Sequence, residues 1–178
     1  MTVGGVKIYN ERTKDMKTEN RMNYDLVHAD SGIKLEWDEC DQLLRVCGSG
    51  RCELGEVRGN LCVENSAEVT VQTVVGDVFS RNYSSLTAVS VKGDACSLEN
   101  SSLTVVSVGG WVQSSGTSSL TAGSIGEWVG SYGTSTLRAE SVGGNAWSWD
   151  NSTLRADRIG GNAWSYDSST ITIDGDKI

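Results

Sequence analysis

The chain has 178 residues, with 15 Lys and Arg against 23 Asp and Glu, a formal net charge of −8 and no proline. This length suits one modest domain, and a 38% apolar content can form a core, which excludes wholesale disorder. The negative charge argues against nucleic acid or an anionic membrane surface as the partner, because like charges repel. No apolar run is long enough for a spanning helix or a secretory signal, so we expect no membrane insertion and a cytoplasmic protein, in the host cytoplasm if a phage encodes it.

Residues 1–50 do not follow the repeat that begins after them, and we predict that they form an N-terminal cap or docking segment. Within them, residues 23–39 alternate polar and apolar side chains, which predicts a hairpin with its turn at Asp30, Ser31 and Gly32. The single histidine, His28, has no Ser or Cys partner for nucleophilic catalysis in the repeat, so we expect no catalytic role for it. The five cysteines show no CxxC pair, and we expect reduced thiols that act as small apolar side chains rather than metal ligands. They are Cys40, Cys47, Cys52, Cys62 and Cys96.

From residue 51 onward the sequence repeats every 17 residues without insertion. Copies begin at residues 51, 68, 85, 102, 119, 136 and 153, a truncated copy begins at 170, and repeat positions are counted from these starts. Apolar residues recur at positions 2, 4, 7 and 11, with the alternation that is typical of short strands. Units this short cannot bury a face alone, so neighbouring copies must stack. The sequence therefore predicts an all-β fold, a single-stranded β-solenoid of about seven coils over residues 51–178, about 35 Å long at about 4.8 Å per coil.

Small residues mark the corners of the predicted coil. Glycine pairs at positions 8 and 9 are predicted to supply the positive φ of a sharp turn, not a phosphate cradle, because no Lys-Ser/Thr follows them. These pairs are Gly109 and Gly110, Gly143 and Gly144, and Gly160 and Gly161. Serine recurs at positions 13 and 17, where we expect inward hydroxyls that bond up and down the stack.

The repeat reads V-x-G-D/N-V/A, as in VVGDV, VKGDA, VGGNA and IGGNA. In this it resembles the bactofilins, a resemblance that covers residues 51–178 and implies a right-handed β-helical core, end-to-end polymerisation and hence a homo-oligomer. The long non-repetitive start departs from the short flexible tails of that family. The repeat is similar also to the solenoids of phage fibres and spikes.

Carboxylates recur at position 5, in Glu140, Asp157 and Asp174. In stacked coils these carboxylates would be about 4.8 Å apart, which is close to the separation of the two carboxyl groups in retaining glycosidases. A glycoside-cleaving enzyme is therefore one possible function. Arg138 and Arg155 stand two residues earlier on the same strand face, so we favour a ladder of ion pairs. We expect no catalytic residues, no metal site and no cofactor.

Hydroxyl side chains recur at positions 1 and 3 of the earlier coils, for example Ser102 and Thr104. Two such parallel ranks resemble the ice-binding faces of antifreeze solenoids. We favour a solvated polar strand, because Arg138 and Arg155 interrupt the rank.

Aromatic residues give the clearest functional signal. If the uniformly small residues at positions 11 and 13 point inward, positions 10, 12 and 14 point outward together. A stripe of seven rings then follows the last four full coils: Trp111 and Trp128 at position 10, Trp147 and Trp164 at position 12, and Tyr132, Trp149 and Tyr166 at position 14. An exposed apolar stripe calls for a partner, and we predict that these rings are the main binding surface for protein, either a second copy or one partner. Rings turned inward as core plugs remain the alternative.

The sequence thus predicts a non-enzymatic interaction or assembly protein. A second open surface is the strand edge after the truncated copy TITIDGDKI, which stops about halfway round a coil and is expected to recruit a second subunit or a partner. Two other functions stay open. A phage-encoded acidic inhibitor would bind a host protein by mimicking a polyanion, and a carbohydrate binder would use the rings together with Asn145, Asn162, Asp150 and Asp167.

Overall fold

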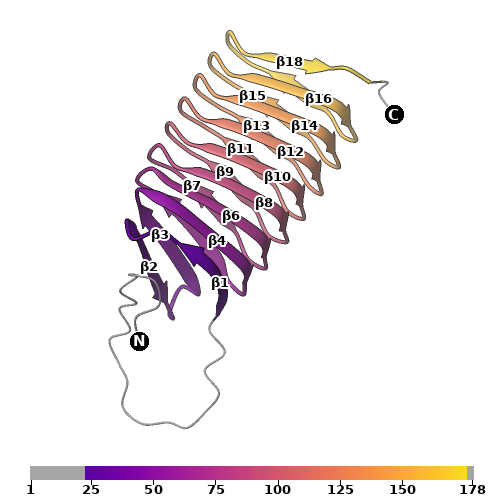
Figure 1. Ribbon diagram of the computed structural model, residues 1–178. Helices are drawn as coiled ribbons and strands as arrows, with labels where there is room; N and C mark the ends of the chain where they lie inside the picture. The colour runs from indigo at the N-terminus through magenta and orange to yellow at the C-terminus, as the bar shows by residue number, and fades with distance from the viewer. Residues whose placement is uncertain (1–22, 176–178) are drawn as a thin grey trace.

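The computed structural model describes residues 23–175, which form two nine-stranded sheets wound as successive coils of one solenoid (Figure 1). One sheet, here the long-strand sheet, contains in spatial order β1 (Tyr24–Ala29), β4 (Gly50–Val57), β6 (Ala67–Val74), β8 (Ser85–Val91), β10 (Ser102–Val108), β12 (Ser119–Ile125), β14 (Thr136–Val142), β16 (Thr153–Ile159) and β18 (Thr170–Ile173). The other, here the short-strand sheet, contains β2 (Ile33–Asp38), β3 (Leu43–Gly48), β5 (Asn60–Glu64), β7 (Val78–Ser80), β9 (Ala95–Ser97), β11 (Val112–Ser114), β13 (Val129–Ser131), β15 (Ala146–Ser148) and β17 (Ala163–Ser165). Among the described residues, no helix is long and apolar enough to cross a membrane.

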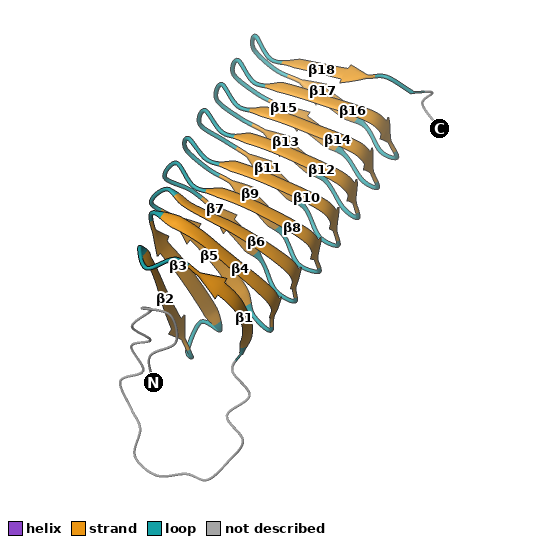
Figure 2. Cartoon of the chain, in the orientation of Figure 1, coloured by secondary structure: helices purple, strands orange, loops and turns teal. Residues whose placement is uncertain are grey.

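Parallel pairing at an offset of one repeat holds the coils together (Figure 2). Leu103, for example, pairs with Leu86 on one side and Leu120 on the other. The same offset already joins β3 to β5, where Leu44 pairs with Leu61. The predicted all-β solenoid with 17-residue coils is confirmed, and with β3 included it makes about eight turns.

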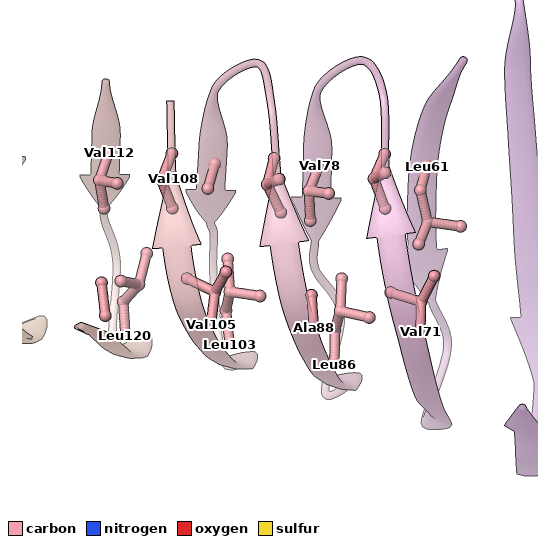
Figure 3. Close-up of a cluster of buried hydrophobic side chains, with 14 of the residues drawn as sticks. Leu61, Val71, Val78, Leu86, Ala88, Leu103, Val105, Val108, Val112 and Leu120 are labelled. Atoms are coloured by element: carbon pink, nitrogen blue, oxygen red, sulfur yellow. The ribbon is translucent and has the colours of Figure 1, made fainter. Parts of the chain in front are cut away.

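The core runs along the axis of the solenoid between the two sheets (Figure 3). Positions 2, 4, 7 and 11 supply it, as predicted, and the fully buried leucines Leu86, Leu103 and Leu120 stack directly above one another. Each such leucine stabilises the fold by about 1.5–3 kcal/mol relative to an exposed one. Alternation holds through position 5, where Val106 is 62% exposed on the outer face, and breaks after it, so that position 7 instead of position 6 is buried.

From β7 to β17, serine ladders line the corner at the end of each short strand. Ser114 Oγ and Ser118 Oγ lie 2.9 Å apart, and Ser118 Oγ donates to the carbonyl of Ser97, one coil earlier, at 2.8 Å. The backbone N–H of Ser115 in turn donates to Ser118 Oγ at 3.2 Å. The prediction of inward hydroxyls bonded along the stack is confirmed, and these bonds satisfy buried polar groups that would otherwise cost about 1–3 kcal/mol each.

The prediction that the glycine pairs supply positive φ is wrong. None of the six glycines has a positive φ; instead, each lies against the backbone or a side chain of the preceding coil. A β-carbon on Gly110 would lie 2.0 Å from Asp94 Oδ1, and one on Gly161 would lie 2.3 Å from Asn145 Oδ1. Position 9 is therefore glycine because the side chain of the Asn or Asp at position 10 of the preceding coil lies over it. That side chain accepts a hydrogen bond from the backbone N–H of the residue after the glycine. Asp94 Oδ1, for example, accepts from Trp111 N at 2.9 Å.

Positive φ occurs instead at position 15, in the turn that follows each short strand. The residues there are Asn65, Asn82, Glu99, Gly116, Gly133, Asp150 and Asp167. Most are Gly, Asn or Asp, the residue types that enter the left-handed region at least cost.

The N-terminal strands differ from the predicted hairpin. The turn at Asp30, Ser31 and Gly32 is present, with Ile33 N donating to Asp30 O at 3.0 Å. However, β1 and β2 do not pair with each other: β1 runs antiparallel to β4 and β2 antiparallel to β3, so each begins a different sheet. The hairpin prediction is therefore wrong. The assignment of 1–50 as a separate cap stays a prediction, because residues 1–22 lie outside the described part, as do 176–178 of the truncated last copy.

Candidate functional site

The seven predicted aromatic residues come together on the outer face of the short-strand sheet. Positions 11 and 13 point inward as expected, since Val112, Val129 and Ser131 are fully buried. The intervening side chains at positions 10, 12 and 14 therefore lie on the outer face. We call the set Trp111, Trp128, Tyr132, Trp147, Trp149, Trp164 and Tyr166 the aromatic ladder.

Rings of the ladder stack on one another because parallel pairing places equal repeat positions about 4.8 Å apart. The ring centroids of Trp111 and Trp128 are 4.9 Å apart with planes 4° from parallel, and those of Trp147 and Trp164 are 5.4 Å apart at 12°. Trp149 stacks between two tyrosines, at 4.7 Å from Tyr132 and 5.2 Å from Tyr166. An edge contact of 5.6 Å between Trp128 and Trp147 joins the columns, so the seven rings form one connected surface.

Glycine at position 12 of one coil makes room for a ring. A β-carbon on Gly130 would lie 2.7 Å from the ring of Tyr132, which therefore covers the place where a position-12 side chain would stand. Burial raises the pKa of the Tyr132 phenol. Sequence reasoning missed this contact, although the isolated glycine in an otherwise bulky column was a signal for it.

The ladder lies outside the hydrophobic core. None of its rings belongs to the core cluster, and the outermost two, Trp164 and Tyr166, are 36% and 44% exposed. The other five rings are half-buried by one another. Trp149, with a stacked ring on each side, presents mainly its edge to solvent, and Trp128 and Trp147 each contact at least two neighbouring rings.

Toward the N-terminal end, the same face carries charged side chains at positions 10 and 14. Glu64 at position 14 pairs with Arg45 and Arg81, at 3.5 and 3.1 Å. At position 10, Asp77 Oδ1 accepts from Asp94 N at 2.9 Å, continuing the column of side-chain acceptors. The stacked rings begin at Trp111, which marks the boundary of the ladder.

Carboxylates border the ladder on both sides. Glu127 at position 9 adjoins Trp128, whereas Asp150 and Asp167 at position 15 follow Trp149 and Tyr166. All three are exposed, and Asp150 Oδ2 accepts from the backbone N–H of the preceding coil's turn at 3.1 Å. The two predicted amide neighbours, Asn145 and Asn162, bond to each other through Asn145 Oδ1 and Asn162 N at 2.9 Å.

The carboxylate column at position 5 lies on the opposite sheet. There Asp174 forms an ion pair with Arg155, while Glu140 and Arg138 are exposed. The hydroxyl ranks are exposed on the same face, in register from β8 to β12. Within residues 23–175, no three His, Cys, Asp or Glu side chains are grouped so that they could hold a metal ion.

The single histidine and the cysteines stand apart from the ladder's rings. His28 Nε2 lies 3.1 Å from Asp30 Oδ1 on the surface. All five cysteines are free thiols, and burial raises the pKa of Cys52 and of Cys96 to about 12. Cys96 occupies position 12 on the ladder's sheet, three coils before Trp147.

Comparisons of the chain with protein-family models, with curated proteins and with solved structures find no match. The resemblance to bactofilins therefore extends to the β-solenoid fold, and no family is identified for the chain.

Proposed function

We propose that this protein is a non-enzymatic interaction module that docks onto a protein surface through the aromatic ladder. The observation that carries the proposal is a connected stack of seven rings on one face, outside the core, on a scaffold that fixes their spacing. Tyr and Trp held rigidly in this way lose little conformational entropy when a partner covers them, which is why such residues dominate binding energy at interfaces.

The direction in which the rings point favours protein over carbohydrate. Sugars stack on aromatic faces, whereas the rings within each column already stack on one another, with centroids 4.7–5.4 Å apart. Four end rings, Trp111, Tyr132, Trp164 and Tyr166, are stacked on one side only. Of these, Trp111 and Tyr132 are half-buried, which leaves Trp164 and Tyr166 as the exposed rings with a face that a sugar could cover. An array of ring edges suits the side chains of a protein partner better.

Paired substitutions on opposite faces test this proposal. Trp147→Ser with Trp164→Ser removes the two rings at position 12, between the columns at positions 10 and 14, and Val89→Ser with Val106→Ser removes two apolar side chains, 46% and 62% exposed, from the other sheet. Tagged versions are produced in the same cells, and the species that co-purify and the oligomeric state are measured by gel electrophoresis and light scattering. We expect the ladder variant to lose association at least tenfold while keeping its β-type circular dichroism, and the valine variant to associate normally. A ladder variant that associates normally, or one that unfolds, contradicts the proposal.

A bactofilin-like assembly through the C-terminal edge is the second candidate. In the interior, the N–H at position 11 donates to the position-10 carbonyl of the next coil, as Ala146 N does to Asn162 O at 2.9 Å. Among the described residues, Ala163 N has no such carbonyl, because β17 is the last strand of its sheet. Adding a bulky charged tail after Ile178 should lower the oligomeric state measured by light scattering if this edge is used; an unchanged size refutes it.

A further inference from the structure

We propose that the partner segment on the aromatic ladder is a basic amphipathic helix of another protein, not a second copy of this chain. The inference rests on the proposed function of the ladder and specifies the chemistry of its partner. Its basis is the charge that surrounds the rings.

On the half of each coil that carries the rings, acidic side chains have no compensating cations, because Arg138, Arg155 and Arg158 of the same coils lie on the long-strand sheet. Positions 8–17 of the copies that begin at residues 102, 119, 136 and 153 contain Glu127, Asp150 and Asp167 but no Lys or Arg. On the short-strand side of the solenoid, the last cation before the ladder is Lys92, at position 8 of the copy that begins at residue 85. The seven rings therefore stand in a negative local field, on a chain whose formal net charge is already −8.

These carboxylates differ from several others in the molecule. Glu64, Glu68 and Asp174 each pair with arginine on the solenoid surface. Within the described part of the chain, Glu127, Asp150 and Asp167 form no ion pair. They are exposed and available to cations of a partner.

Charge also decides against a second copy on this face. Two ladders facing each other would bring six carboxylates together, which opposes association. They would also set the electropositive ring edges of one ladder against those of the other. A basic segment neutralises the acidic borders, and its apolar side chains can cover the rings.

The dimensions of the ladder match a short helix. From position 10 to position 14 the strand advances about 13 Å, and three coil steps span about 14 Å. An α-helix is about 10–12 Å wide and rises 1.5 Å per residue, so about ten residues lying along the ladder would cover its width and length. Such a helix places its apolar stripe on the rings and its basic flanks over Glu127 on one border and Asp150 and Asp167 on the other.

Synthetic helices of opposite charge test the proposal. The probes are two 14-residue peptides with the same leucine stripe, acetyl-LKKLLKKLLKKLLK-amide and acetyl-LEELLEELLEELLE-amide, titrated into the full chain by isothermal calorimetry at low and high salt. We expect the lysine peptide to bind with one-to-one stoichiometry and at least tenfold more tightly than the glutamate peptide, with an affinity that falls as salt rises.

Two triple variants of equal charge change separate the ladder from the general charge of the protein. Glu127→Gln, Asp150→Asn and Asp167→Asn neutralise the borders, and asparagine tolerates the positive φ of 61° and 56° at the two aspartates. Glu53→Gln, Glu140→Gln and Asp157→Asn neutralise three carboxylates on the long-strand sheet. We expect the first set of substitutions to lower the affinity for the lysine peptide at least tenfold. The second set should change that affinity less than twofold.

Each contrary result has a distinct meaning. Equal binding of both peptides, equal effects of the two triple variants, or self-association that competes with the peptide overturns the basic-helix proposal. Suppose that Trp147→Ser with Trp164→Ser abolishes association while the charge variants leave the affinity for the lysine peptide unchanged. The ladder then remains a docking surface, and only its preference for a basic partner is refuted. If neither peptide binds and the tryptophan variant associates normally, both proposals fall.

Discussion

Substituting Gly110 by alanine tests why glycine occupies position 9. A β-carbon there would lie 2.0 Å from Asp94 Oδ1 and 3.0 Å from Gly93 O. Asp94 would have to rotate away, and its hydrogen bond from Trp111 N at 2.9 Å would break. A hydrogen bond to a charged group contributes about 1.5–3 kcal/mol, so we expect Gly110→Ala to lower the free energy of unfolding by about that amount.

A second glycine in the same position provides the matched control. Gly144 follows a coil with Trp128 at position 10 instead of Asn or Asp, and a β-carbon on it would meet nothing nearer than Glu127 O at 3.0 Å. Alanine there also reduces the entropy of the unfolded chain, which stabilises by about 0.4–1 kcal/mol. That gain offsets part of the strain from the tight backbone contact, so we expect Gly144→Ala to cost clearly less than Gly110→Ala.

Thermal unfolding followed by circular dichroism measures both variants, since 1 kcal/mol shifts the melting temperature of a protein of this size by about 2–4 °C. Adding Asp94→Ala should remove most of the extra cost of Gly110→Ala, because the clash partner is gone. Equal costs for the two glycine substitutions, or a full extra cost in the absence of the Asp94 carboxylate, would refute the close-approach explanation.

Three further predictions concern polar and thiol groups. Ser118→Ala removes a buried hydroxyl that bonds to the preceding coil and should cost about 1–3 kcal/mol by chemical denaturation, whereas the exposed neighbour Ser119→Ala should cost almost nothing. Burial, with the charges of nearby carboxylates, raises the pKa of Asp94, so its contribution to stability is present below pH 3.8 and is lost as pH rises through the folded-state value. Asp94→Asn should abolish that loss in a pH series of melting curves. Because the pKa of Cys96 is about 12, iodoacetamide at pH 8 should label Cys40 in the native protein and Cys96 only after unfolding.

The arrangement of inward and outward side chains was predictable because every coil repeats the environment of the one before it. Small residues at positions 11 and 13 sufficed to place the aromatic positions on the outer face, as Ser131 and Trp147 illustrate. The serine ladder followed from the same logic, since a hydroxyl buried in every coil must bond to its neighbours.

What the sequence did not reveal depends on contacts between coils and on the choice of partner strand. Glycine at position 9 suits both a left-handed turn and a close approach, and only the structure shows Asp94 lying over Gly110. Alternation in residues 24–38 is the same whether β1 and β2 pair with each other or each begins a separate sheet. Ring stacking depends on side-chain rotamers, so the cover that Tyr132 provides for Gly130 had to be seen in the structure. The recurrence of Gly, Asn and Asp at position 15 was in the sequence and marked the true left-handed corner.

Oxidative footprinting measures most directly whether the aromatic ladder is a docking surface. The protein is exposed to hydroxyl radicals once after purification and once in an extract of the cells that make it, and labelling of each ring is compared by mass spectrometry. Tyr83, 70% exposed and distant from the ladder along the repeat, is the internal reference. We predict that labelling of Trp164 and Tyr166 falls severalfold in the extract relative to Tyr83, and that Trp147→Ser with Trp164→Ser abolishes this protection at Tyr166. Equal labelling of the ladder and of Tyr83 in both preparations would contradict the account.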